Sequence, residues 1–274
     1  YSLSALFEKS FYFGLDLAAS YTFGHSKSVY DGTSSVAYSN WKYNYAVDSN
    51  NPGLAYSMFD IPHRVMVSVG YRTPRYAKGF MATTVSLVYN GYVGQRYSLT
   101  MNESYYDAEK KKTVYIDYNG DGWGGNSLLY IPTEDELQKM DFKTEEDRRK
   151  FDEWIEGDSY AKKHRGAYAM RNSNSALWEN RVDLHVAQDI FVLKDRGSKF
   201  QVTFDVTNFA NMLNKKWGTT YTAAYNVMPL QVIGSKKGED GNYTNTYAYN
   251  SRNTITKNDV LSRWHAQIGI KYIF

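Results

Sequence analysis

The sequence predicts an all-β fold, in which six antiparallel strands form part of a transmembrane β-barrel. Three observations predict it. Long segments alternate apolar with polar residues, the connections between these segments alternate in length, and there is no run of about 18–20 apolar residues that a helical span would need. A large soluble β-sandwich would also explain the strand pattern. It gives no reason for long and short connections to alternate.

The clearest alternation covers the last fifteen residues, 260–274. One set of alternate positions is almost entirely apolar or aromatic and ends at Phe274, and the other contains Arg263, His265, Gln267 and Lys271. Globular strands average about 5–6 residues, whereas about 9–11 tilted residues cross a bilayer. The segment also resembles the C-terminal signal by which bacterial outer-membrane proteins are recognised for assembly. The residues that carry this resemblance are Ile268, Ile270, Tyr272 and Phe274.

The same period predicts five earlier strands, at residues 11–24, 60–72, 81–89, 181–192 and 200–207. Two short turns, 73–78 and 194–198, and three long loops, 25–59, 91–177 and 210–258, connect them. In outer-membrane barrels the short turns are periplasmic and the long loops extracellular. We therefore expect a bacterial outer-membrane location, with the three loops outside the cell and the C-terminus in the periplasm.

Charged residues and one histidine occupy polar positions of these strands, which would face the barrel interior. They could contact a plug or a substrate, or form an ion-pair network that holds the wall together. These residues are Arg64, Arg72, Arg181, Asp183, His185, Asp189, Asp205, Arg263 and Lys271.

Six strands are too few to close a bacterial barrel, for which about eight is the smallest number. An open sheet would leave two unpaired edges in hydrocarbon, at several kcal/mol for each unpaired group. The chain begins at Tyr1 without a signal-like segment. We therefore expect it to be the C-terminal part of a larger barrel, and its start to reflect processing or a longer polypeptide.

Tyrosine is the outlier in the composition, with 26 residues, while cysteine is absent and the net charge is only +3. This charge gives no reason to expect a nucleic-acid partner. Amphipathic rings suit membrane interfaces and ligand-facing loops. The loop tyrosines could form an aromatic funnel for a substrate, or simply pack the loops together: Tyr43, Tyr45, Tyr105, Tyr106, Tyr221, Tyr225, Tyr247 and Tyr249.

One loop segment, DYNGDG at residues 117–122, fits the opening of a calcium-binding loop. Asp117, Asn119, Asp121 and the carbonyl of Trp123 would supply the oxygens. The twelfth position is Leu128, where an EF-hand has a bidentate glutamate. The alternative is an aspartate–glycine turn without a metal. No other cofactor is expected.

Two short helices are predicted in the second loop. One opens at residues 132–136, and Thr144 caps the other, which carries several carboxylates. A solvated helix face has the same pattern as an acid–base site. There is no H-E-x-x-H, G-x-S-x-G or phosphate-loop motif, and the five histidines lack metal-ligand spacing. We predict no catalytic residues and no enzymatic activity.

Three segments carry a resemblance to a known family. They are DYNGDGWGGNSLLYIP at 117–132, HRGAYAMRNSNSALWENRVDLHVAQDIFV at 164–192 and FDVTNFANMLNKKWG at 204–218. Together with the terminal phenylalanine they resemble TonB-dependent outer-membrane receptors of Bacteroidota-type bacteria, particularly the Oar-like group. SusC-type glycan transporters are similar in the last segment and the ending. The sequence departs from the pattern at Ser127, where the family has an acid.

The resemblance implies a 22-stranded barrel with an N-terminal plug, energised by the TonB complex. It also implies import of a bulky substrate, with peptides as the candidate class. Outer-membrane lipid would surround the barrel, and a surface lipoprotein could cover it as a lid. Neither the plug nor the TonB box lies in these residues. A passive porin-like channel, or an adhesin or surface-assembly barrel that binds a partner through its loops, remains the alternative.

Overall fold

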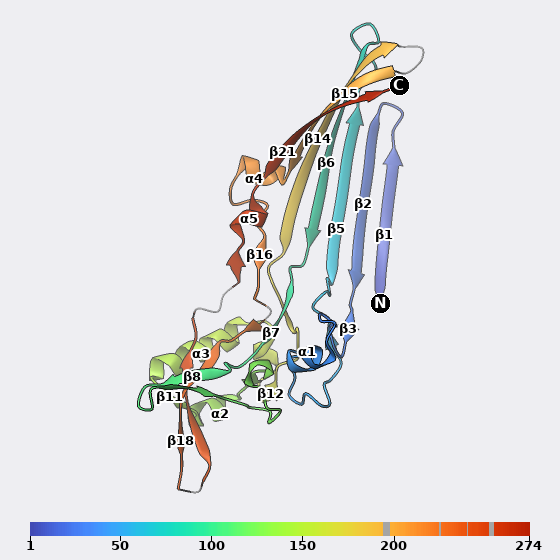
Figure 1. Cartoon of the computed structure of the whole chain (residues 1–274). Coiled ribbons are helices and arrows are strands. Elements are labelled where there is room, and N and C mark those ends of the chain that lie inside the picture. The colour runs from blue at the N-terminus through green and yellow to red at the C-terminus, as the bar shows by residue number, and fades with distance from the viewer. Residues whose placement is uncertain (194–197, 225, 240, 252–254) are drawn as a thin grey trace.

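The computed structural model describes residues 1–193, 198–224, 226–239, 241–251 and 255–274, and most of its regular structure is β-strand. Its largest element is a seven-stranded antiparallel sheet whose strands are adjacent in chain order (Figure 1). The strands are β1 (Ser2–Ser10), β2 (Leu15–Gly24), β5 (His63–Arg72), β6 (Met81–Tyr92), β14 (Glu179–Leu193), β15 (Ser198–Thr207) and β21 (His265–Ile273).

The register of this sheet separates an apolar face from a polar face. Leu17 is aligned with Val69, and Val69 with Leu87, along one face. Ser86 is aligned with His185 on the other. Many apolar side chains on the first face are exposed, for example Ile270 at 76%. The predicted strand alternation is therefore confirmed.

The prediction of six strands is wrong, because β1 precedes them. In the sequence the apolar alternation of β2 continues back through Phe13 and Phe11, but in the structure residues 11–14 form the β1–β2 turn. The Phe11 N–H donates to Leu15 O, and Gly14 has a φ of +93°. β1 itself was missed since Lys9 lies on its apolar face and Leu6 on its polar face, which obscures the period of two.

The terminal strand is shorter than predicted. Residues 260–264 do not belong to it, because α5 (Asp259–Ser262) lies directly before β21. The Asn258 side chain accepts a hydrogen bond from the Leu261 N–H and so caps this single turn. Apolar residues at 260 and 261 fit both structures, and the cap decides between them.

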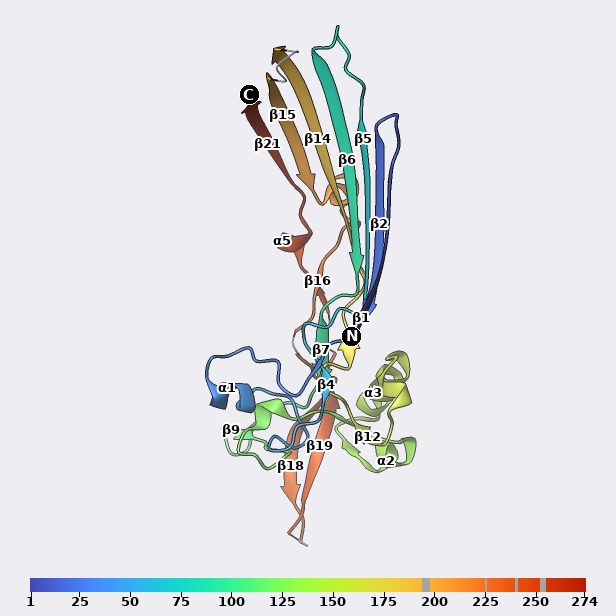
Figure 2. The ribbon, with the colours of Figure 1, turned by 90° about the vertical axis from the view of Figure 1, so that its right-hand side faces the viewer.

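The connections alternate in length as predicted. Residues 11–14 and 73–80 connect strands at the end of the sheet where the C-terminus lies. The predicted turn at 194–198 lies, apart from Ser198, outside the described residues. Three long connections, residues 25–62, 93–178 and 208–264, gather at the opposite end. We call the described part of these connections the loop cap. Figure 2 shows most of it below the sheet, while α5 lies higher, beside the strands.

Short elements build the loop cap. Its helices are α1 (Ala37–Lys42), α2 (Glu134–Lys139), α3 (Glu145–Gly157), α4 (Phe209–Leu213) and α5, with 3₁₀ helices η1 (Gly124–Asn126) and η2 (Ala161–Lys163). Its strands are β3 (Lys27–Ser28), β4 (Ala55–Tyr56), β7 (Arg96–Leu99), β8 (Ser104–Asp107), β9 (Lys112–Tyr115), β10 (Tyr130–Ile131), β11 (Asp141–Phe142), β12 (Ala167–Tyr168), β13 (Asn174–Ser175), β16 (Tyr221–Thr222), β17 (Asn226–Val227), β18 (Leu230–Lys237), β19 (Tyr243–Tyr249) and β20 (Thr256–Lys257).

The loop cap has a hydrophobic core of its own. Leu99 and Ile131 from the second connection and Val232 from the third are buried in it, together with Phe151 and Ile155 of α3. Both connections therefore contribute to one core.

Both predicted helices are present. Thr133 and Glu136 form a capping box at the start of α2, and the Thr144 hydroxyl accepts from the Asp147 N–H at the start of α3. In the part of the chain that is described, no helix is long and apolar enough to cross a membrane.

Candidate functional site

The polar face of the sheet carries a charge cluster centred on Asp189. Arg72 Nη2 lies 2.8 Å from Asp189 Oδ2, and Lys199 Nζ lies 2.7 Å from the same oxygen. Gln201 Nε2 donates to Asp189 Oδ1 at 2.8 Å. The carboxylate is almost fully buried, so two cations and an amide replace the water it has lost. The cluster joins β5, β14 and β15 near the end with short connections.

Two further pairs lie on this face. His185 Nδ1 and Asp205 Oδ1 are 2.5 Å apart across β14 and β15, and Arg181 Nε lies 3.1 Å from Asp183 Oδ1. All four side chains are about half exposed. They are accessible to a molecule in front of the sheet and contribute little to its stability.

The remaining predicted polar-face residues differ in position. Arg64 Nε donates to Asn90 Oδ1 at 3.1 Å, and Lys271 is aligned with Gln201. Arg263, in contrast, is the residue after α5 and not part of the strand, so its prediction as a strand residue is wrong. The structure places all the others on one face.

Asn208 joins the end of β15 to two segments of the loop cap. It has a left-handed backbone, and its N–H donates to Asp183 Oδ1 at 2.7 Å. Its side-chain amide donates to Gly218 O and Ser262 O, both at 2.8 Å. A Cβ at Gly218 would lie 1.9 Å from Asn208 Oδ1, so only glycine fits. Asn208 is therefore a structural connector in this chain.

A buried ion pair connects the first two long connections. Arg96 of β7 donates to Asp60, which lies before β5, while His25 Nδ1 is 3.2 Å from the same oxygen. The Ser26 N–H donates to Asp60 Oδ1 at 2.6 Å. Burial alone would raise the pKa of Asp60, but the hydrogen bonds from Ser26, Arg96 and His25 outweigh it and hold the pKa below its usual value. Asp60 is thus an ionised anchor.

A second buried arginine, Arg171, has a side chain only 4% exposed. Its Nη1 lies 3.0 Å from Asp31 Oδ2 and 2.8 Å from Asn44 Oδ1, and its Nη2 donates to Ser28 O at 2.5 Å. Asn172 Nδ2 also donates to Asp31, at 3.2 Å. Burial lowers the pKa of Arg171, and the charge of Asp31 opposes this effect. Arg171 therefore fixes the fold of the first long connection.

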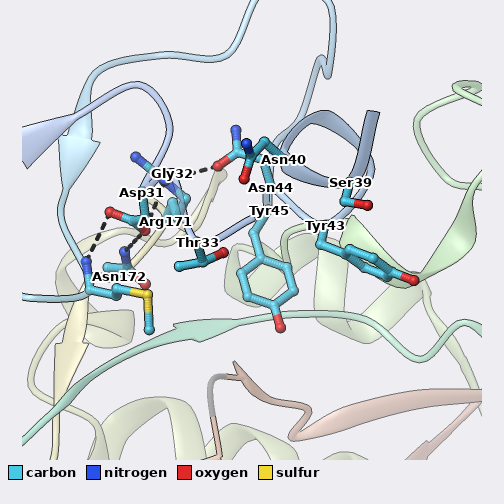
Figure 3. A pocket seen from close by; sticks show the side chains of 11 residues that line it. Asp31, Gly32, Thr33, Ser39, Asn40, Tyr43, Asn44, Tyr45, Arg171 and Asn172 are labelled. Atoms are coloured by element: carbon cyan, nitrogen blue, oxygen red, sulfur yellow. Dashed lines mark hydrogen bonds and ion pairs between the residues drawn. The ribbon is translucent and has the colours of Figure 1, made fainter. Parts of the chain in front are cut away.

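A cavity of about 360 Å³ opens beside this cluster. Figure 3 shows Arg171 and Asn172 gathered around Asp31 on one side, with the rings of Tyr43 and Tyr45 on the other. The polar side chains of Asp31, Asn44, Arg171 and Asn172 that line it already form hydrogen bonds with one another. The cavity is within the size range of small-molecule sites.

A second hollow, of about 390 Å³, lies over the core of the loop cap. Four tyrosines line it, Tyr118, Tyr130, Tyr168 and Tyr247, with methionine, leucine and proline side chains and one carboxylate, Glu136. We call it the tyrosine groove. Burial raises the pKa of Tyr118 well above the usual tyrosine value, so this ring stays neutral.

The predicted loop tyrosines do not meet at one surface. Tyr43 and Tyr45 line the cavity beside Arg171, and Tyr247 lines the tyrosine groove. Tyr105 and Tyr249 pack against the core, Tyr106 is exposed, and Tyr221 lies by Trp217 in a third hollow. Tyr225 is outside the described residues. Their division between core and cavities supports packing as one of their roles.

The calcium-loop residues are close together, but the carboxylate oxygens of Asp117 and Asp121 already accept hydrogen bonds. Asp117 accepts from the N–H groups of Gly120, Asp121 and Gly122, as in an aspartate–glycine turn. Asp121 accepts from the Trp123 N–H at 2.7 Å and from other side chains. Asn119 Oδ1 is buried without a partner. Among the described residues no group of three or more His, Cys, Asp or Glu could hold a metal ion. The calcium site stays a prediction.

The four residues of the predicted assembly signal lie at the free edge of the sheet. Ile268 and Ile270 are exposed on β21, and Phe274 is 96% exposed after it. The Tyr272 ring lies 4.9 Å from that of Phe200 on β15 and 6.1 Å from that of Phe274. The apolar residues therefore remain available to another surface.

The sequence did not single out Asp60–Arg96, Arg171–Asp31 or the tyrosine groove. Each depends on residues from distant segments that no local pattern connects. The one available signal is that Arg96 and Arg171 stand among apolar and small polar residues, where an arginine needs a buried partner. No family model matches the chain, and neither a curated protein nor a solved structure matches it.

Proposed function

We propose that this chain forms part of a bacterial outer-membrane barrel that imports a bulky substrate, with peptides as the proposed class, using energy from the TonB complex. The observation that carries the proposal is the two-faced sheet. Its strands have 9–15 residues, an exposed apolar face and a polar face with an ion-pair network. This is the length and polarity that a bilayer and an aqueous lumen require.

The open edges support a larger barrel. In the described structure β1 and β21 each pair on one edge only. Unpaired N–H and C=O groups cost several kcal/mol each in hydrocarbon. We therefore propose that further strands close the sheet, 22 in all as the family resemblance implies, with lipid outside and a plug inside.

The loop lengths support an orientation. The loop cap would lie outside the cell, and the short connections and the C-terminus in the periplasm, as in known outer-membrane barrels. The TonB complex would act through a segment beyond these residues, and a surface lipoprotein could cover the loop cap.

An adhesin barrel is the second candidate, because the loop cap has a hydrophobic core and two hollows of its own. It would bind a partner and import nothing. A plug-free porin is the third, and it would conduct ions in a planar bilayer.

Uptake by intact cells tests the proposal. Cells that make the full polypeptide should accumulate labelled peptides, and an uncoupler of the proton-motive force should abolish the accumulation. Uptake that resists the uncoupler would indicate a passive channel, and absence of uptake with intact partner binding would indicate an adhesin. The intact mass and N-terminal sequence of the native polypeptide come first: a mass near 31.5 kDa with Tyr1 at the start would contradict the 22-stranded barrel.

A further inference from the structure

The tyrosine groove combines features that recognise an organic cation. Tyr130 and Tyr168 are a cross-strand pair of β10 and β12, with ring centroids 5.1 Å apart and planes at 66°. Tyr118 and Tyr247 line the same hollow. The faces of tyrosine rings attract cations, and several rings around one space form an aromatic cage.

A single carboxylate stands in this lining. Both oxygens of Glu136 lie 3.0 Å from the Tyr130 hydroxyl, and Oε2 accepts from the Thr133 N–H at 2.9 Å. The hydrogen bonds from Thr133 and Tyr130 lower the pKa of Glu136, so it is ionised at neutral pH. A carboxylate has about four lone-pair sites, and these bonds leave room for a cation.

The charges around the groove leave a net attraction for a cation. None of the lining residues is a lysine, arginine or histidine. Arg165 donates to Pro132 O at the margin, but it pairs with Asp152 and Glu156 at 2.6 and 2.8 Å. Lys139 is exposed at the end of α2, and Glu134 and Asp135 in the first turn of the same helix outnumber it.

The size and the mostly apolar lining suit a flat or extended side chain better than a bare metal ion. The floor is apolar, with Leu128, Leu230 and the flexible Met140 beside the rings. A hollow of about 390 Å³ is much larger than one ion and holds a peptide side chain with its neighbouring backbone. A guanidinium stacks on aromatic faces and pairs with a carboxylate through its planar fork.

We propose that the tyrosine groove binds an arginine side chain of an extracellular peptide, with the guanidinium against the tyrosine rings and beside Glu136. This inference rests on the proposed function only in placing the loop cap outside the cell. It adds a preference for basic peptides.

Calorimetry on the purified full polypeptide in detergent tests the groove with two end-capped tripeptides, Gly-Arg-Gly and its citrulline analogue. Citrulline has nearly the shape of arginine but no charge. We expect the arginine peptide to bind about three- to tenfold more tightly. Equal affinities, or absence of saturable binding, would overturn the proposal.

Two variants locate the binding. Tyr168→Leu removes an exposed ring but keeps an apolar side chain, and Glu136→Gln removes the charge but keeps a residue suited to the capping box. Each should weaken the arginine peptide about threefold or more and leave the citrulline peptide unchanged. Tyr115→Leu, at an exposed tyrosine of β9 outside the groove, is the matched control. If both groove variants bind the arginine peptide as tightly as this control, the peptide does not bind in the groove. An unchanged unfolding temperature shows that each variant is folded.

The outcomes separate this inference from the proposed function. Binding of the arginine peptide without energised uptake would support the groove and contradict import. Energy-dependent uptake at the same rate for the arginine and the citrulline peptide, together with no binding to the groove, would support import. That result would overturn this inference.

Discussion

Arg96 donates from Nε and Nη2 to the same carboxylate oxygen of Asp60, at 3.1 and 2.7 Å. Its guanidinium also lies over the ring of Tyr56, 4.2 Å from the centroid. The pair joins β7 to the segment that enters β5, and both side chains are buried. It therefore holds the first two long connections together beside the end of the sheet.

Replacing Arg96 with methionine should loosen the loop cap. Asp60 would remain buried with only part of its hydrogen bonding, which costs about 3–5 kcal/mol for a buried pair. Limited proteolysis of the purified protein should show faster cleavage in residues 25–62. Arg181→Gln, at a half-exposed pair, is the control and should change cleavage little. Equal cleavage of both variants would show that the anchor is unimportant.

The same anchor should weaken in acid. The pKa of Asp60 is lower in the folded protein than in the unfolded chain, where the pKa of aspartate is about 3.9. Ionised Asp60 therefore contributes fully to stability at a pH above the pKa of the unfolded chain. This contribution is lost as the pH falls through the lower pKa of the folded protein. Cleavage of residues 25–62 by a protease that is active in acid should increase only below about pH 4. Asp60→Asn should remove this increase, and an unchanged pH profile in that variant would contradict the assignment.

Gly14→Ala should impair the β1–β2 turn. The backbone of Gly14 has a φ of +93°, and a Cβ there would lie 2.2 Å from Arg72 O. Strain of this kind costs about 1–3 kcal/mol. Refolding yield, followed by the gel shift between folded and heated protein, should fall. Gly53→Ala is the control, since its Cβ would meet no atom within 4 Å. A similar yield for both variants would contradict the turn geometry.

Asp189→Asn should destabilise the sheet from its polar face. Arg72 and Lys199 would lose their shared carboxylate, and hydrogen bonds to charged groups contribute about 1.5–3 kcal/mol. When samples are heated to a series of temperatures before electrophoresis, the temperature at which the folded band disappears should fall. Asp205→Asn, whose partner His185 is half exposed, should have a smaller effect. The reverse order would show that the cluster is not the main connection between these strands.

The calcium prediction has a direct test. The carboxylates of Asp117 and Asp121 already accept hydrogen bonds from backbone N–H groups, so calcium would share their oxygens with these donors. If the loop binds calcium, calorimetric titration should give heat with the wild-type protein and none with Asp117→Asn. No heat at about millimolar calcium, the weak end of calcium-site affinities, would leave the aspartate–glycine turn as its structure.

The sequence predicted the sheet better than the loops, for a physical reason. Each strand from β2 onward has one apolar side and one polar side, so a period of two appears in its residues. It failed where local signals overrode that period: Asn258 caps α5 inside the predicted terminal strand, and Gly14 ends the apparent run that begins at Phe11.

The candidate sites were predicted in part. The polar-face residues follow from strand parity, and all except Arg263 lie where expected. The groove and the two buried arginines could not be predicted in the same way. Their partners lie far apart in sequence, as Arg171 and Asp31 do at 140 positions, and no periodic pattern connects them.

The mixed origin of the loop-cap core dictates an order of events during biogenesis. Leu99 and Ile131 precede the β14–β15 hairpin in the chain, whereas Val232 follows it. The core therefore cannot close until the third long connection packs against the second. Until then its apolar side chains lack part of their cover, and such exposed apolar surface is prone to aggregation. Completion of the loop cap is thus a late step of folding, because it needs residues from both sides of the β14–β15 hairpin in the sequence.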